Sequence, residues 1–67
     1  MYGYRIYYND EEGRRYETEN DEGYLDESTA YEIAEKKILR EIENEGYERK
    51  EINKEMEKYD IETYHVR

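Results

Sequence analysis

Apolar residues occupy every second position at the start of the chain. Tyr2, Tyr4, Ile6 and Tyr8 alternate with other residues, which is the period of a β-strand that buries one face. The following residues, 9–13, are Asn-Asp-Glu-Glu-Gly and favour a turn. The pattern therefore predicts a strand followed by a tight connection.

A second stretch, Arg14–Asn20, is also typical of a strand, and the two together predict a hairpin. A common core face requires that Tyr8 lies opposite Arg14, Ile6 opposite Tyr16, and Tyr4 opposite Thr18. In this register the outer face of the second strand carries Arg15, Glu17, Glu19 and the neighbouring Asp21. The residues at 20–23, Asn-Asp-Glu-Gly, favour a second turn.

Helical spacing of apolar residues begins after this turn. Thr29 and Glu32 fit a capping box, with Asp26 and Ser28 as competing caps. Gly46 suits the position after the end of a helix, so we predict a helix over residues 29–45. Its apolar face contains Ala30, Tyr31, Ala34, Ile38, Leu39 and Ile42.

Residues 48–58 leave two alternatives open. Their composition and the spacing of Ile52, Met56 and Tyr59 favour a short second helix, whereas an irregular strand around Arg49–Asn53 is the alternative. Residues 60–66 favour a last strand with imperfect alternation, as at a bulge or a sheet edge. The whole chain, 1–67, is expected to form one α+β domain, in which a small antiparallel sheet (the N-terminal hairpin plus the C-terminal strand) packs on one long helix.

Tyrosine dominates the apolar composition, because the chain has ten Tyr, no Phe and no Trp. Most of these rings must help to fill the core, with each hydroxyl reaching water or a partner. Tyrosine is also frequent on binding surfaces, and Tyr7 and Tyr24 are the two that we assign to a partner-binding surface as readily as to the core.

The residues that carry most enzyme chemistry are scarce. The chain has no Cys, one Ser (Ser28) and one His (His65), so no nucleophile and base pair is evident, and we expect no enzyme activity. The acidic turns do not fit a calcium-binding loop, and we expect neither a metal site nor a cofactor. Direct nucleic-acid binding is not expected, because most bases lie close to acids. No apolar run is long enough for a membrane span, and we expect a cytoplasmic protein.

Charge is the strongest functional signal. The net charge is -9, and no base stands between Arg15 and Lys36. A helix N-terminus favours the acids near it, which accounts for Asp26 and Glu27. Four others, on the outer strand face and its turn, have no such explanation, and with the two tyrosines they form the predicted partner-binding set: Glu17, Glu19, Asp21, Glu22, Tyr7 and Tyr24.

Alternate strand residues stand about 6.6 Å apart, of the order of the separation of successive phosphates along a nucleic-acid strand. The size, acidity and tyrosine content of the whole chain resemble those of phage-encoded inhibitors of host defence, such as anti-CRISPR and anti-restriction proteins. The resemblance implies an inhibitor that occupies the basic, nucleic-acid-binding surface of a target protein. The alternative is an interaction module or homodimeric small subunit, which pairs through its sheet edge and has no nucleic-acid-related target.

Overall fold

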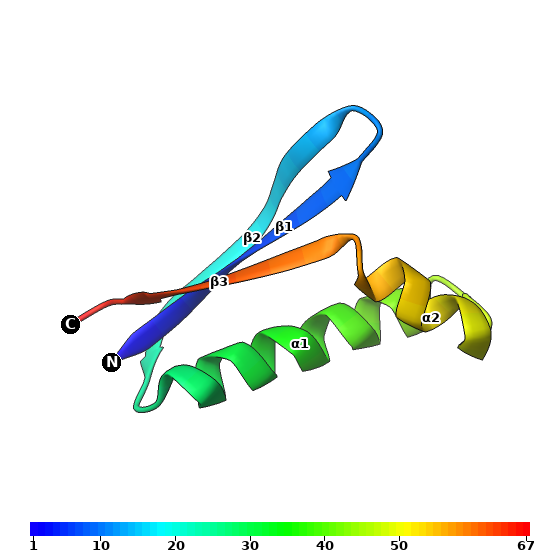
Figure 1. The fold of residues 1–67 in the computed structure, drawn as a ribbon. Coiled ribbons are helices and arrows are strands. Elements are labelled where there is room, and N and C mark those ends of the chain that lie inside the picture. The colour runs from blue at the N-terminus through cyan, green and yellow to red at the C-terminus, as the bar shows by residue number, and fades with distance from the viewer.

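The computed structural model describes all residues, Met1–Arg67, and has five elements in the order strand, strand, helix, helix, strand (Figure 1). The strands form one antiparallel sheet in the order β2-β1-β3, with β1 in the centre. This arrangement confirms the predicted α+β fold, including the pairing of the hairpin with the C-terminal strand. The elements are β1 (Tyr2–Asp10), β2 (Gly13–Tyr24), α1 (Glu27–Asn44), α2 (Arg49–Met56) and β3 (Tyr59–His65).

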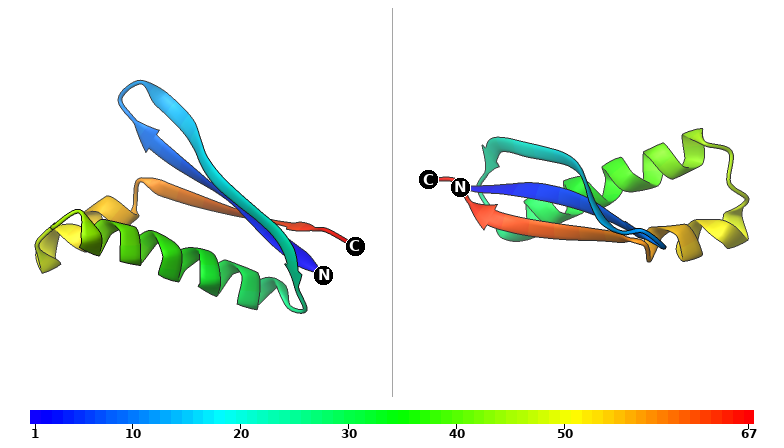
Figure 2. Two further views of the ribbon diagram at one scale, coloured as in Figure 1. Left: turned by 180° about the vertical axis from the view of Figure 1, so that it is seen from behind. Right: turned by 90° about the horizontal axis from the view of Figure 1, so that it is seen from above.

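The long helix α1 crosses one face of the sheet and leaves the other face uncovered, as the two views of Figure 2 show. The shorter helix α2 packs beside the C-terminal end of α1 and leads the chain back to β3. The sheet is therefore covered by one layer, and both of its outer strands, β2 and β3, have an open edge.

The core is a narrow contact between α1 and the central strand. Tyr4 and Ile6 of β1 pack against Ala34, Ile38 and Ile42 of α1, and each of the five is at most 3% exposed. The helical side chains repeat at four-residue intervals, which places them in one row on the helix surface. Burying an isoleucine contributes about 1.5–3 kcal/mol, so this row supplies much of the driving force for folding.

Helix α1 begins two residues earlier than the capping box predicts. Its N-cap is Asp26, which has an extended backbone and forms no side-chain cap hydrogen bond, while its carbonyl oxygen accepts from the Ala30 N–H at 3.2 Å. Thr29 thus lies inside the first turn. The predicted C-terminal end is confirmed within one residue: Glu45 is the C-cap and Gly46 follows with φ of +89°.

The short second helix is confirmed as α2, and the strand alternative for Arg49–Asn53 is wrong. Ile52 and Met56 pack against the core cluster, so the apolar spacing in this segment does reflect helical packing. The last strand is also confirmed, at the edge of the sheet, as the imperfect alternation predicts.

The predicted hairpin register is wrong, by one residue at Tyr8 and by two at Ile6 and Tyr4, which lie opposite Thr18 and Asn20. Tyr8 lies opposite Arg15, because β1 continues to Asp10 and pairs there with Gly13 across a two-residue loop. The Asp10 carboxylate accepts the Glu12 N–H at 2.8 Å and closes this loop. Tyr16 consequently lies opposite Tyr7 on the uncovered face and is 56% exposed, instead of packing in the core.

The second predicted turn is also wrong, because residues 20–23 belong to β2. The strand absorbs the extra residues in an irregularity: Tyr4 pairs with Asn20, whereas Tyr2 pairs with Tyr24. The Asn20 side-chain oxygen accepts the Glu22 N–H at 2.9 Å, which holds the local bend. The chain therefore turns toward α1 only after Tyr24.

We expect Gly3→Ala to lower the free energy of unfolding by about 1–3 kcal/mol through overpacking. A Cβ at Gly3 would lie 2.6 Å from the backbone oxygen of Asn20 and 3.0 Å from the Tyr64 ring, so strands would have to shift. Urea unfolding measures the change. Gly46→Ala is the control without crowding: no atom lies within 4 Å, and its positive φ alone should cost about 1–2 kcal/mol. A Gly3→Ala variant as stable as the wild-type protein would contradict the close packing around Gly3.

We expect the protein to lose stability between about pH 10 and 12. Burial raises the pKa of the Tyr59 phenol from 10.0 to about 12, so folding favours its protonated form. This contribution is fully present below the ordinary pKa and is lost as the pH rises through the folded value. Chemical unfolding at several alkaline pH values should show a smaller decline for Tyr59→Phe. An equal decline in both proteins would contradict the assignment.

Candidate functional site

The six predicted partner-binding residues do not share one surface. The outer, uncovered face of the sheet holds Tyr7 and Glu19, whereas Glu17 and Tyr24 lie on the side that faces the helices. Asp21 and Glu22 lie at the far end of β2. Contact of all six with one partner stays a prediction, and the structure distributes them over three regions.

Glu19 belongs to an ion-pair network at the centre of the outer face. Arg5 of β1 donates from Nε to Glu19 and from Nη1 to Glu62, each at 3.1 Å. These hydrogen bonds, first that of Glu19, raise the pKa of the Arg5 guanidinium. The guanidinium carbon also lies 4.1 Å from the ring centroid of Tyr64. The charge of Glu19 is thus compensated by Arg5 of the neighbouring strand.

Glu17 points to the opposite side of the sheet from Glu19, and the predicted common face is wrong. Tyr7 pairs with Tyr16 and Ile6 pairs with Thr18, so Glu17 is an unpaired bulge residue. One extra residue reverses the side to which the neighbouring side chains point.

The Glu17 carboxylate accepts a hydrogen bond from Arg15 Nε at 3.1 Å. The Arg15 guanidinium lies over Tyr8, with 5.2 Å between its carbon and the ring centroid, and Tyr8 faces the helices. Glu17 is therefore neutralised as well, in a separate network from that of Glu19.

The two predicted tyrosines differ in role. Tyr7 lies on the outer face beneath the Arg14 guanidinium, at 4.0 Å, and meets Tyr16 edge-on. Tyr24 is half-buried and stacks parallel to Tyr4 at a centroid distance of 6.5 Å. Burial raises the pKa of the Tyr24 phenol. Tyr7 is thus placed on a surface that a partner could reach, and Tyr24 is a core residue.

Asp21 and Glu22 are exposed and form no ion pair. They stand where β2 ends and the chain turns into α1 (Figure 1). The N-cap residue Asp26 and the acids in the first half of α1 are also exposed and form no ion pair. We call this set the acidic end, and its members are Asp21, Glu22, Asp26, Glu27, Glu32 and Glu35.

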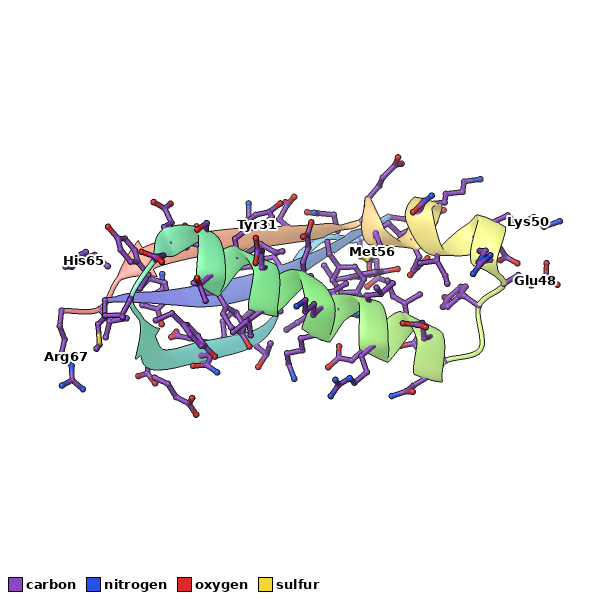
Figure 3. All side chains as sticks on the ribbon, turned by 90° about the horizontal axis from the view of Figure 1, so that it is seen from below. Tyr31, Glu48, Lys50, Met56, His65 and Arg67 are labelled. Carbon is purple, nitrogen blue, oxygen red and sulfur yellow. The ribbon has the colours of Figure 1, made fainter.

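Part of the acidic end lines a groove between α1 and β3. The groove is open, has a volume of about 590 Å³, and is formed by Glu27, Ser28, Tyr31, Glu32 and Glu35 of α1 with Thr63 of β3. Tyr31 is 45% exposed, and Figure 3 shows it on the flank of α1 beside β3. The Thr63 hydroxyl donates to Glu27 at 2.7 Å and connects the two walls.

This groove was not predicted from the sequence, and neither Glu32 nor Glu35 was in the predicted partner-binding set. Glu27, Tyr31 and Glu35 are spaced by four residues, which places them in one row on a helix. That spacing was a usable signal for the row. The sequence predicts that β3 joins the sheet but not that it lies beside this row, because the order of the strands follows from tertiary packing.

The other flank of α1 has the opposite charge. A smaller groove between α1 and β2, of about 360 Å³, contains Lys36, Lys37 and Arg40, with Glu41 as its only acid. Lys37 pairs with Glu41 at 3.5 Å within the helix. The helix thus separates an acidic groove on the β3 side from a basic groove on the β2 side.

Glu55 is a structural residue of α2. It is 7% exposed, accepts a hydrogen bond from the Tyr8 hydroxyl at 3.1 Å, and pairs with Lys58 Nζ at 3.1 Å. Its contact raises the pKa of the Lys58 ammonium. Replacement of Glu55 by a basic residue would leave the half-buried Tyr8 hydroxyl and the Lys58 ammonium without their partner, so Glu55 is unsuitable as a surface control.

The remaining polar groups show packing and no evident reaction chemistry. His65 meets Tyr2 edge-on at 5.1 Å. The Tyr64 hydroxyl is buried without a hydrogen-bond partner, and burial, followed by the charge of Glu19, raises the pKa of the phenol. No cluster of three or more His, Cys, Asp or Glu side chains has an arrangement suited to a metal ion.

Neither helix combines the length and the apolar composition that crossing a membrane requires. Comparisons of this chain with models of protein families, with curated protein sequences and with solved structures found no significant match.

Proposed function

We propose that this protein is a non-catalytic inhibitor that binds a basic, nucleic-acid-binding surface of a target protein through its acidic end. One observation carries the proposal: six exposed carboxylates gather where β2 meets α1, and none forms an ion pair within the protein. Such a concentration of one charge attracts a positively charged partner and increases the rate of encounter.

The energetic argument is that the acidic end does not serve the fold. Like charges on neighbouring positions of a helix or strand repel one another and lower stability. The acids of the hairpin avoid this cost, because Glu17 and Glu19 each pair with an arginine. The unpaired carboxylates remain available to a partner, so the contact we propose lies at the end of the sheet and along α1 instead of on the outer strand face.

The second candidate function is a homodimeric interaction module with no nucleic-acid-related target. The observation in its favour is that both outer strands, β2 and β3, leave an edge unpaired. Size-exclusion chromatography with light scattering separates the two candidates. A stable dimer that has no salt-sensitive partner would favour the module.

We expect charge reversal at the acidic end to weaken inhibition. The target is first captured from a cell extract and eluted with salt, and the protein is then titrated into the complex of that target with its nucleic acid. Wild-type protein should displace the nucleic acid, and Asp21→Lys/Glu22→Lys should need at least about tenfold more protein, as for the loss of about 1.4 kcal/mol. Displacement should weaken steeply as salt rises, because exposed charges are screened.

The matched control is Glu43→Lys/Glu51→Lys. It makes the same change in net charge, and both positions are exposed acids that form no ion pair, far from the acidic end. This control should displace the nucleic acid like wild type. Equal losses in both double variants would contradict the proposal, since they would show a dependence on net charge alone. A captured target that never releases nucleic acid would contradict it too.

A further inference from the structure

The open edge of β3 presents unpaired backbone groups. The Asn9 N–H donates to Lys58 O, and the Val66 N–H donates to Met1 O, at 2.7 and 2.8 Å. Hydrogen-bonded pairs alternate along an antiparallel ladder, so the even-numbered residues of β3 bond to β1. The odd-numbered ones direct their backbone N–H and C=O groups away from the sheet, and they are Tyr59, Ile61, Thr63 and His65.

The acidic groove runs directly beside this edge. Thr63 contributes to both, since its side chain lines the groove and donates to Glu27, while its backbone faces outward. A strand added to β3 would direct alternate side chains to the helix side of the sheet, where the groove lies. Backbone pairing and side-chain contact are therefore available to the same extended segment.

The geometry of the groove suits the spacing of an extended chain. Residues four apart on a helix are separated by a rise of about 6 Å, and alternate residues of a strand by about 6.6 Å. The spacing of successive inward side chains of an added strand is therefore similar to that of Glu27, Tyr31 and Glu35 along α1.

The charges select a basic occupant. Glu27, Glu32 and Glu35 line the groove without an internal ion pair, and an ammonium or guanidinium could also lie on the exposed ring of Tyr31. On the outer face of the same strand, Asp60 and Glu62 already pair with Arg14 and Arg5, so the selection for a basic occupant lies in the groove.

A second copy of the chain is a poor occupant of this edge. Two β3 strands paired about a two-fold axis would place against the acidic groove a strand that contains no lysine or arginine. The hairpin tip is a protruding part that another copy could offer, and its two-residue loop consists of Glu11 and Glu12. Charge complementarity therefore favours a partner of different sequence.

We propose that the edge of β3 and the acidic groove together bind an extended, lysine- or arginine-rich segment of a partner protein as a fourth strand of the sheet. The proposal rests on the proposed function and names the part of the partner that is recognised. Backbone hydrogen bonds supply register-independent affinity, and the groove selects basic side chains at alternate positions.

The test uses the full chain and a seven-residue peptide, the length of β3, in which lysine alternates with threonine. We expect NMR shifts and slowed hydrogen exchange at the amides of Tyr59, Ile61, Thr63 and His65. N-methylation of the peptide amides that face β3 should weaken binding at least about tenfold, because the added strand loses its donors. Replacement of lysine by glutamate in the peptide should abolish binding.

Protein variants separate the two parts of the surface. Thr63→Pro removes a backbone donor that faces outward, and proline is accepted on edge strands. Thr63→Val removes the hydroxyl contact with Glu27 but retains the N–H, and is the matched control. We expect Thr63→Pro, and separately Glu32→Lys/Glu35→Lys, to weaken peptide binding at least about tenfold, and Thr63→Val to bind within about threefold of wild type.

Two results would overturn this proposal. Equal binding of the normal and N-methylated peptides would show a charge contact without strand pairing, and this comparison remains decisive even where Thr63→Pro fails to fold. Protection of the β3 amides in the protein alone, together with a dimer by light scattering, would assign the edge to a second copy. Either result leaves the nucleic-acid displacement test of Asp21→Lys/Glu22→Lys unaffected, so the two proposals fail separately.

Discussion

The narrow contact between α1 and the central strand determines the rest of the structure. Ala30 and Ala34 have small buried side chains on the face of α1 toward the sheet. Ile38 and Ile42 pack against Tyr4 and Ile6 of β1, so one row of side chains supplies the helical half of the core. Residues of the outer strands, Tyr24 of β2 with Tyr59 and Ile61 of β3, pack against this cluster but are only partly buried. Grooves lie on either side of α1, and the edges of β2 and β3 are open because the sheet has only three strands. The surfaces that we propose for binding thus lie where the small core and its single long helix leave the sheet open.

The arginines of the hairpin explain which acids remain free. Only Arg5, Arg14 and Arg15 precede Lys36 in the sequence, and each lies on a tyrosine ring of the sheet and pairs with carboxylates nearby. These residues stabilise the face that no helix covers, because a guanidinium stacked on an aromatic ring covers apolar surface while its nitrogens bind acids. All three arginines therefore have their carboxylate partners within the hairpin and β3. The carboxylates of the acidic end form no ion pair, because Lys36, Lys37 and Arg40 lie on the other flank of α1, where Lys37 pairs with Glu41. The negative charge of the acidic end therefore remains uncompensated after folding.

The sequence allowed prediction of those features that depend on local spacing. The helix, its end at Gly46, the short second helix and the pairing of the two terminal segments were all predictable, since they follow from apolar periods and a residue suited to positive φ. The faces of β2 were not predictable. Their assignment depends on a two-residue loop and a bulge at Glu17, and one residue of slip moves Tyr16 out of the core and separates Glu17 from Glu19. The candidate site shifted for the same reason, because ion pairs across strands can be assigned only when the register is known.

An extended basic segment reconciles the fold with the proposed inhibition. A rigid basic surface would meet carboxylates of α1 but could not use the backbone groups of β3, whereas a flexible chain satisfies both at once. Basic arms of this kind are what many nucleic-acid-binding proteins extend along phosphates. A chain that is drawn into the sheet as a fourth strand would be unavailable to nucleic acid, because one edge of its backbone pairs with β3 and its inward side chains lie in the acidic groove. The acidic end then acts on the arm rather than by copying the shape of a duplex, and a single row of acids on one helix flank is sufficient for that purpose.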